Sequence, residues 1–376
     1  MVTRKKIQEL CSTIVSGGTP STQHKEWYDG DIPWLNTKEV KFNKIESTER
    51  SITSEGLANC SAKWVPANTV VVAMYGATAG NVAITGIPLT TNQACCNLIV
   101  NPDVADYRYV YYALMKANKQ LKSLANGGAQ QNLSVKQIKD FAIPVPYIDE
   151  QREIAEILYK LDEKINLNSK INDNLYAVLE AVYQEKFTKP KSESKIGILS
   201  DICFYANDKI DVSKLDTRSY FSTENMLPEK KGASNATQLP TVSKVTACSR
   251  GDTLISNIRP YFKKIVYSEI KCGCSNDVLC FSPKSQKYSS YLFSTLFDDA
   301  FFAFMTAGSK GTKMPRGDKV QIMTYPVKLP ADNEVEAFNT VAIPILKQIH
   351  SNNMENRELA SLRDSLLKTL LSDATK

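Results

Sequence analysis

Hydrophobic residues recur in heptads over two long stretches of the chain. Between Ile154 and Val182 the apolar positions alternate steps of four and three residues, which is typical of a helix that packs along one seam. A second stretch between Phe338 and Leu366 repeats this spacing. The pattern predicts two long helices whose seam positions are Ile154, Leu158, Leu161, Ile165, Asn168, Asn172, Leu175, Ile345, Ile349, Asn352, Asn356, Leu359 and Leu366.

Two asparagines interrupt each predicted seam at matched places. Asn168 and Asn172 lie 184 residues before Asn352 and Asn356. A polar residue buried in a helix seam reduces stability but fixes the register and the partner. The matched pairs therefore predict that the two helices pack on each other in one register. The alternative interpretation is that Asn168 and Asn172 mark a frayed or exposed middle of the first helix.

The second helical stretch contains a proline, Pro344. Proline inside a helix removes one backbone hydrogen bond and clashes with the preceding turn. We therefore expect a kink or a helix start near Ile343 and a continuous helix over residues 345–371. Arg363 also falls in this seam, which makes the second stretch less regular than the first.

The regions outside the two helices also repeat. Residues 69–72 and 253–256 are β-rich runs 184 residues apart, and the same offset aligns Asn92 with Asn276 and Cys96 with Cys280. Each region then continues with a predicted helix, at 107–125 or 288–305, and a glycine-containing loop. This repeat predicts two copies of one α+β domain joined by two long coiled-coil helices. The predicted boundaries are 1–147, 148–190, 191–330 and 331–376.

Composition places the chain among ordinary folded proteins. Its 376 residues are 43% hydrophobic, which is enough to give each predicted domain a core. The first residues lack the apolar run of a secretion signal, and no apolar stretch approaches the roughly 18–20 residues that span a bilayer. The nine cysteines are irregularly placed and do not resemble a disulfide framework. We expect a soluble, cytoplasmic protein.

Charge is distributed unevenly between the predicted segments. Lys and Arg outnumber Asp and Glu by 15 to 11 in 1–147 and by 20 to 13 in 191–330. The helical segments are acidic, with 6 basic against 9 acidic residues in 148–190 and 5 against 7 in 331–376. The basic surplus thus lies where a nucleic-acid footprint is expected, although ordinary surface variation is the alternative for the first domain.

The residue types that most enzymes need are scarce. His24 and His350 are the only histidines, which leaves little material for a general base or a histidine-rich metal site. No phosphate-binding glycine-lysine motif occurs, and NPDV at 101–104 lacks the second proline and aromatic residue of an adenine methyltransferase motif. EKK at 229–231 lacks the acidic partner of a metal-dependent nuclease. CGC at 272–274 with Cys280 lacks zinc spacing, so we interpret these residues as reduced strand cysteines and expect no metal.

Side chains able to read base edges gather on predicted loops of both domains. Asn and Gln suit adenine, whereas Arg and Lys suit guanine, and the types differ between the two copies. A Lys263→Ala change at a phosphate contact is expected to weaken binding to all sequences alike and to flatten the salt dependence by about one unit. For any single residue, the alternative is an ordinary polar surface side chain. The candidate DNA-binding residues are Thr19, Ser21, Lys38, Tyr75, Thr78, Asn92, Gln93, Gln130, Gln131, Asn132, Arg259, Lys263, Lys264, Asn276, Lys310, Lys313 and Arg316.

Several short strings together resemble the specificity subunit of type I restriction-modification systems. In the first half they are GGTPS at 17–21, WYDGDIPW at 27–34, YGATAG at 75–80, TNQA at 91–94, NL at 132–133 and IPVP at 143–146. The helices contribute EQREIA at 150–155, ENREL at 355–359 and LRDSLL at 362–367. The second half departs from this pattern, because it has no counterpart of 17–21 and carries Arg259-Pro260 where the first half has Tyr75-Gly76.

The resemblance implies a chain without an active site of its own. In that family two target-recognition domains sit on two antiparallel helices, and each reads one half of an interrupted, asymmetric DNA sequence. The resemblance further implies two methyltransferase subunits docked on the helices, with S-adenosylmethionine, and restriction subunits that use ATP and Mg²⁺. A helix over 150–187 would be about 57 Å long, or roughly 17 base pairs. The rival interpretations are a coiled-coil scaffold that binds only protein and a self-sufficient nuclease or methyltransferase.

Overall fold

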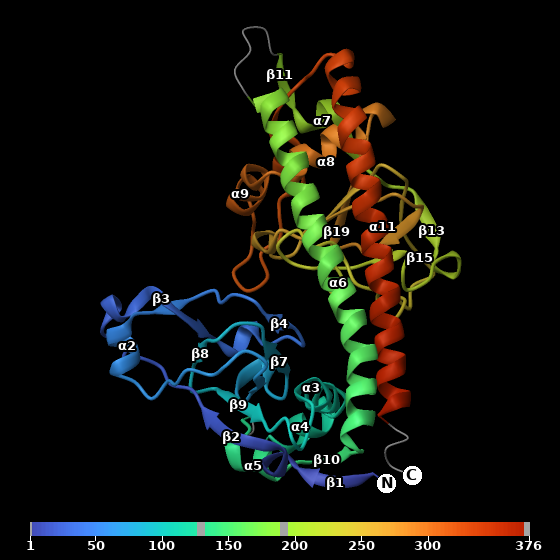
Figure 1. Cartoon of the computed structure of the whole chain (residues 1–376). Coiled ribbons are helices and arrows are strands. Elements are labelled where there is room, and N and C mark those ends of the chain that lie inside the picture. Colours follow the sequence, from blue (N-terminus) through green and yellow to red (C-terminus); the bar gives the residue numbers. More distant parts are fainter. Residues whose placement is uncertain (1, 126–131, 189–194, 372–376) are drawn as a thin grey trace. The chain divides into compact units, whose positions relative to one another are not determined.

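The computed structural model describes residues 2–125, 132–188 and 195–371. The chain divides into two compact units, Met1–Glu163 with Ala360–Lys376, and Lys164–Leu359. Each unit contains one α+β domain together with segments of two long helices, α6 (Ile148–Tyr183) and α11 (Asp332–Leu370), coloured green and red in Figure 1. Among the described residues, no helix is both long enough and apolar enough to cross a membrane.

The first unit is built on a five-stranded sheet with the order β2-β9-β6-β7-β4. Buried Val70 and Val72 on one face of β6 pack with Tyr109 and Tyr112 of α3 and with Leu158 of α6. A smaller cluster covers the other face. The elements are β2 (Cys11–Ser16), β3 (Tyr28–Leu35), β4 (Lys44–Ile45), β5 (Ser51–Ile52), α2 (Ser54–Ala58), β6 (Val70–Ala73), β7 (Val82–Thr85), β8 (Thr90–Thr91), β9 (Cys95–Val100), α3 (Tyr107–Lys116), α4 (Asn118–Leu124) and α5 (Val135–Asp140).

The second unit repeats this plan around a four-stranded sheet with the order β12-β19-β16-β17. Buried Ile255 of β16 packs toward Tyr291 and Phe293 of α8, and toward Leu179 of α6. The elements are β12 (Cys203–Tyr205), β13 (Lys209–Asp211), β14 (Tyr220–Phe221), β15 (Lys244–Cys248), β16 (Thr253–Ser256), β17 (Ile265–Tyr267), β18 (Cys272–Cys274), β19 (Val278–Pro283), α8 (Ser289–Phe297), α9 (Asp299–Ala307) and α10 (Lys319–Met323). The predicted α+β class and its internal repeat are therefore confirmed.

The predicted alignment of the repeats is wrong by one residue within the sheets. Strand β6 starts at Val70 and β16 at Thr253, an offset of 183 residues, whereas α6 and α11 start at Ile148 and Asp332, an offset of 184. Side chains alternate across a strand, so a one-residue slip exchanges the two faces. With the corrected offset Gln93 is equivalent to Asn276, and Asn92 to Ser275, because the amides of Cys95 and Val278 bond to the carbonyls of Asn92 and Ser275.

Each domain begins and ends on a two-stranded antiparallel ribbon. In the first unit β1 (Thr3–Lys6) pairs with β10 (Ala142–Val145), and a single short helix, α1 (Ile7–Leu10), follows β1. In the second unit β11 (Ile196–Ile198) pairs with β20 (Pro326–Lys328), followed by α7 (Leu199–Ile202). The ribbon closes each domain next to the start of the long helix that follows it in the chain.

Helix α11 is longer than the sequence predicts. It begins at Asp332 and continues through Pro344, so the expected start near Ile343 is wrong. Pro344 removes one backbone bond but lies exposed, while Phe338, Ala342 and Leu346 on either side of it are buried. Packing of this apolar face stabilises the helix across the missing bond.

Two predicted shorter helices are each divided in two. The stretch 107–125 forms α3 and α4, and the stretch 288–305 forms α8 and α9. Asp298 separates the second pair, because its backbone is extended and its carboxylate accepts a hydrogen bond from the amide of Ala300 over 2.9 Å. Such a cap satisfies an otherwise unpaired amide and starts a new helix.

The asparagines of the predicted seam are buried, so the interpretation of a frayed or exposed helix middle is wrong. Asn168 and Asn172 are 1% and 5% exposed. Within the second unit Asn168 donates to Asn356 over 3.0 Å and Asn172 to Asn353 over 2.9 Å. Rising numbers on α6 meet falling numbers on α11, so the paired segments are antiparallel. No seam residue among those predicted is exposed.

Arg363, the irregular seam residue, has a polar partner in the first unit. Its guanidinium forms an ion pair with Asp162 at 2.7 Å, and the hydroxyl of Tyr112 donates to the same carboxylate over 2.7 Å. The two charged side chains are only about a fifth exposed, at 19% and 20%. The carboxylate of Asp162 therefore joins α11, α6 and α3.

All nine cysteines are free, and seven of them are buried. Cys272 and Cys274 lie on β18 and Cys280 on β19, where they pack with Cys248 in an apolar cluster that also contains Phe221 and Leu254. The interpretation of these residues as reduced strand cysteines is confirmed. Burial raises the pKa of the Cys96 and Cys203 thiols to about 12.

Candidate nucleic-acid interface

In the first unit two glycines bring three loops together at one end of the sheet. A methyl group on Gly17 would lie 2.1 Å from the carbonyl oxygen of Thr91, and one on Gly18 would lie 2.2 Å from the amide of Ala62. Only glycine permits approaches this close. The indole of Trp34 fixes the loop further by donating to the carbonyl of Gly18 over 2.9 Å.

These contacts position the polar residues of the candidate site. The hydroxyl of Thr19 hydrogen-bonds to the side chain of Gln93. The side-chain amide of Asn92 donates to Oδ1 of Asn36 over 3.1 Å. Tyr75 follows β6 and forms a bridge with Asn132, while the preceding amide of Met74 donates to Ala94 over 2.8 Å. Thr19, Tyr75, Asn92, Gln93 and Asn132 therefore form one group, the first loop cluster.

The other candidates of the first domain take different places. Thr78 lies in the 3-10 turn Gly76–Thr78 beside Tyr75, and Ser21 is exposed two residues after Thr19. Lys38 lies two residues after Asn36 and forms an ion pair with Glu49. Gln130 and Gln131 lie outside the described residues. Asn36 and Trp34 were not among the sequence candidates, because residues that hold a neighbour in place leave no motif of their own.

The second unit carries a corresponding group at the same end of its sheet. Ile258 follows β16 and forms a bridge with Arg316, as Tyr75 does with Asn132. The backbone of Arg316 exchanges two hydrogen bonds of 2.9 Å with Lys310. Arg259 donates from Nη2 to the carbonyl of Lys313 over 3.2 Å. Arg259, Lys310, Lys313 and Arg316 form the second loop cluster, with exposed Asn276 next to Asp277, the ion-pair partner of Arg316.

Two predicted cations of the second domain are engaged elsewhere. Lys263 forms an ion pair of 3.1 Å with Asp299, which also binds Lys230 at 2.7 Å. The hydrogen bonds from Lys230 and Lys263 lower the pKa of Asp299. Lys264 points inward and donates to the carbonyl of Thr223 over 2.5 Å, and burial lowers its pKa. Lys263 and Lys264 therefore stand apart from the second loop cluster.

Exposed apolar side chains accompany the second loop cluster. Tyr261, Phe262 and Met314 are 46%, 38% and 47% exposed. Tyr261 and Phe262 form the 3-10 turn Pro260–Phe262 between Arg259 and Lys263, two residues with left-handed backbones. Sequence reasoning overlooked them, although aromatic residues between cations are a feature of nucleic-acid surfaces. The same is true of Asp277, the carboxylate that holds Arg316.

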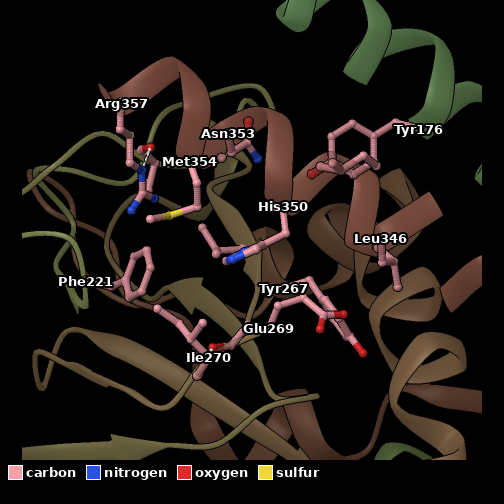
Figure 2. Close-up of a pocket in the computed structure, with 15 residues that line it drawn as sticks. Tyr176, Phe221, Tyr267, Glu269, Ile270, Leu346, His350, Asn353, Met354 and Arg357 are labelled. Carbon is pink, nitrogen blue, oxygen red and sulfur yellow. Dashed lines mark hydrogen bonds between the residues drawn. The ribbon is translucent and has the colours of Figure 1, made fainter. Parts of the chain in front are cut away.

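A small cavity lies where α11 meets the second domain, and Figure 2 shows the residues around it. Arg357 donates to the carbonyls of Ala233 and Arg218, each over 2.9 Å, and its guanidinium lies 5.5 Å from the ring centre of Phe221. The cavity volume is about 30 Å³. This is space for about one or two water molecules. Its role is structural, because Arg357 ties the domain to the helix.

The described part of the chain offers no cluster of ligands for a metal. Within residues 2–125, 132–188 and 195–371, no three His, Cys, Asp or Glu side chains come together in a way that could hold an ion. Both loop clusters instead present amides, hydroxyls and guanidinium groups, which are hydrogen-bonding groups suited to base edges and phosphates.

These features define a class of α+β proteins in which two related domains are built on a pair of long antiparallel helices. Residues 2–177 match the family model of the type I restriction modification DNA specificity domain. This match and the relatives below confirm the resemblance of the first half of the chain to type I specificity subunits.

Two curated relatives are similar in sequence to this chain over part of their length. The chain is 33% identical over 187 residues to the type I restriction enzyme MjaIX specificity subunit of Methanocaldococcus jannaschii, covering 49% of this chain and 42% of that one. It is 32% identical over 156 residues to the EcoR124I/EcoR124II specificity subunit of Escherichia coli, covering 40% and 38%. The chain thus spans about two fifths of the length of these relatives.

A solved structure supports the fold over nearly the whole chain. The crystal structure of the type I restriction-modification system S subunit from M. genitalium superposes with a TM-score of 0.58, covering 99% of this chain and 96% of that one. The sequence identity is 17%, so this likeness concerns the fold.

Proposed function

We propose that this protein is the DNA-recognition subunit of a type I restriction-modification complex and has no active site of its own. Each loop cluster reads one half of a bipartite, asymmetric sequence. The observation that carries the proposal is that equivalent backbone positions bear different base-reading groups. Asn132 and Arg316 occupy such a pair, whereas Gln93 and Asn276 occupy a second pair that keeps the same carboxamide group on side chains of different length. Two half-sites of different sequence require different base-reading side chains, and here such side chains stand on equivalent backbone positions.

The two long helices are the proposed docking sites for two methyltransferase subunits. Helix α6 exposes Leu167, Ile171 and Val178, three large apolar side chains that are 54%, 38% and 49% accessible. They lie at a helical spacing outside the seam, so they form a second apolar stripe. An exposed apolar stripe on a helix favours contact with another protein. S-adenosylmethionine, and ATP and Mg²⁺ for restriction subunits, would be bound by these partners, in the cytoplasm.

Mapping of methylated adenines in genomic DNA tests the proposal. Cells supplying the matching methyltransferase subunit are compared with and without this gene. We expect an asymmetric bipartite motif that is methylated only when the gene is present. Replacement of residues 191–330 by another recognition domain should then change one half of the motif alone. Identical methylation without the gene would contradict the proposal and favour a protein-binding scaffold.

The docking surface is tested separately. An Ile171→Glu change places a charge in the middle of the stripe. An Asn166→Glu change, which adds the same charge at another exposed position of α6, is the matched control. We expect the first variant alone to lose co-purification with the methyltransferase subunit while it retains the helical circular dichroism of the parent chain. Retained assembly would exclude this stripe as the docking site.

A further inference from the structure

Arg316 combines a fixed backbone with an accessible side chain. Its amide and carbonyl bond to Lys310, the amide of Arg259 donates to Pro315 over 2.8 Å, and the amide of Gly317 donates to Asn257 over 3.3 Å. The peptide backbone at this position is therefore held from both sides at the end of β16. A side chain on such a support is well placed to read a ligand, because little further ordering is needed.

Asp277 orients the guanidinium of Arg316 but leaves some of its N–H donors free to bind a ligand. Nε and Nη2 both lie 3.3 Å from one carboxylate oxygen of Asp277. This separation is longer than the roughly 2.7–2.9 Å of a strong charge-assisted hydrogen bond. The side chain is 52% exposed and that of Asp277 is 45% exposed. Donors of the guanidinium thus remain directed to the solvent, and its plane is set by the carboxylate.

Arg259, the other arginine of the second loop cluster, contacts the protein itself. Its backbone is left-handed, with a φ of 51°. Its Nη2 donates to the carbonyl of Lys313, and its Nε is buried without a hydrogen-bond partner and so is closed to solvent. Arg259 therefore shapes the loop, whereas Arg316 faces outward from it. Lys310 forms an ion pair with Asp318 at 2.6 Å, and a compact ammonium group lacks the planar fork of a guanidinium.

The equivalent position of the first domain carries a different reader on the same support. Asn132 is exposed and bridges Tyr75, and the next amide, that of Leu133, donates to Met74 over 2.8 Å. This matches the bond from Gly317 to Asn257 in the second domain. The two domains therefore share the backbone position and differ in the chemistry of the side chain, an amide in one and a guanidinium in the other.

We propose that Arg316 is a specificity-determining residue that reads one guanine in the half-site of the second domain, with Asp277 holding its guanidinium in place. The proposal rests on the proposed function and deepens it. Arginine is the side chain that donates two hydrogen bonds to O6 and N7 of guanine in the major groove. Asp277 is a positioning residue, because its carboxylate orients the fork and does not itself touch the base.

Binding by the complex assembled with its methyltransferase subunits tests the proposal. The probe is a set of duplexes carrying the mapped motif, with each base of the second half-site replaced in turn. We expect one guanine whose replacement weakens binding by about 5- to 150-fold, the range for one bidentate base contact. Arg316→Ala should lower affinity for the intact motif by a similar factor and remove the preference at that base alone.

Two further variants separate the contact from general effects. Arg316→Lys keeps the charge but not the fork, so it should lose the guanine preference while keeping affinity for unrelated DNA. Arg218→Ala is the matched control, since Arg218 forms a surface pair with Asp216 of 3.0 Å at 53% and 49% exposure. The control should bind as the parent complex does. Asp277→Asn should weaken the preference by a smaller factor than Arg316→Ala.

Three results would overturn the proposal in distinguishable ways. A second half-site without guanine, or an Arg316→Ala complex that keeps every base preference, rejects Arg316 as a reader. Uniform weakening on all sequences, with a salt slope reduced by about one, makes Arg316 a phosphate contact instead. A parent complex without any sequence preference rejects the proposed function itself, and the guanine contact with it.

Discussion

Asn352 of α11 donates a hydrogen bond from Nδ2 to Oδ1 of Asn172 on α6, over 2.8 Å. Asn168 makes the reciprocal contact with Asn356, over 3.0 Å. In the repeat, Asn352 is equivalent to Asn168, and Asn356 is equivalent to Asn172. The contact between Asn352 and Asn172 is therefore equivalent to the contact between Asn168 and Asn356. Both contacts lie within the second unit. They specify one register for the antiparallel pairing.

An Asn172→Ala variant should lose stability. It leaves the Nδ2 group of Asn352 buried without its acceptor, which costs about 1–3 kcal/mol. Replacing Asn172 and Asn352 together by Leu should cost less than the single change, because the groups that then lose a partner, on Asn353 and Gln348, are accessible to water. Denaturant unfolding of the three proteins checks both outcomes. Asn174→Ala, at an exposed position of α6, is the control, and an equal loss in this variant would contradict the role of the buried pair.

A Gly18→Ala change should damage recognition by one domain only. The added methyl group would lie 2.2 Å from the amide of Ala62, so the loop that carries Thr19 must move. We expect affinity for the half-site of the first domain to fall at least tenfold, whereas base preferences in the other half-site persist. Competition binding with duplexes altered in either half measures this, and the second half-site is the internal control. Equal losses in both halves would indicate general unfolding instead.

Lys313 should contribute a phosphate contact. It is exposed in the second loop cluster, whereas Lys263 is bound to Asp299. Lys313→Ala should weaken binding to all sequences alike and reduce the slope of log affinity against log salt by about 0.9. Lys263→Ala, the change considered from the sequence, should have a smaller effect. An unchanged slope for Lys313→Ala would place this residue outside the footprint.

His350 should make stability depend on pH. Burial lowers its pKa below the usual 6.5, with Glu269 opposing and Arg357 reinforcing the shift. The unfolded chain therefore binds a proton more readily, and stability falls as pH drops below about 6.5 until the folded-state pKa is reached. His350→Gln should reduce the loss of unfolding free energy between pH 7 and pH 5. His24→Gln, at an exposed histidine, is the control, and equal losses in both variants would argue against His350.

The sequence was sufficient for those features that depend on periodicity. The seam, its buried asparagines and the internal repeat all follow from hydrophobic spacing. A helix predicted from this spacing can continue through a proline when buried apolar residues flank it, as α11 does at Pro344. The single-residue change of offset between sheet and helix was not accessible, because strands with valine or isoleucine on both faces read alike in either register. The starts of β6 and β16 and the hydrogen bonds of Cys95 and Val278 resolve it.

The candidate site was predicted less well than the fold. Loop composition brought out Gln93, Asn132 and Arg316, but not which cations point inward. Lys263 and Lys264 follow Arg259 by four and five residues, and their partners Asp299 and Thr223 come from distant parts of the sequence. Trp34 and Asp277 hold other residues of the site in place through contacts between distant parts of the sequence, and the local sequence does not predict such contacts.

The burial of seven of the nine cysteines makes this protein a reporter of its own integrity. Thiolates react with alkylating reagents, and burial keeps these reagents away from seven thiols of the folded chain. Only Cys11 and Cys60 are partly accessible, and the pKa of Cys11 is raised to about 12. Mass increments after brief maleimide treatment therefore count unfolded domains directly. Modification at Cys95 and Cys96 would report the first domain, and at Cys272, Cys274 and Cys280 the second.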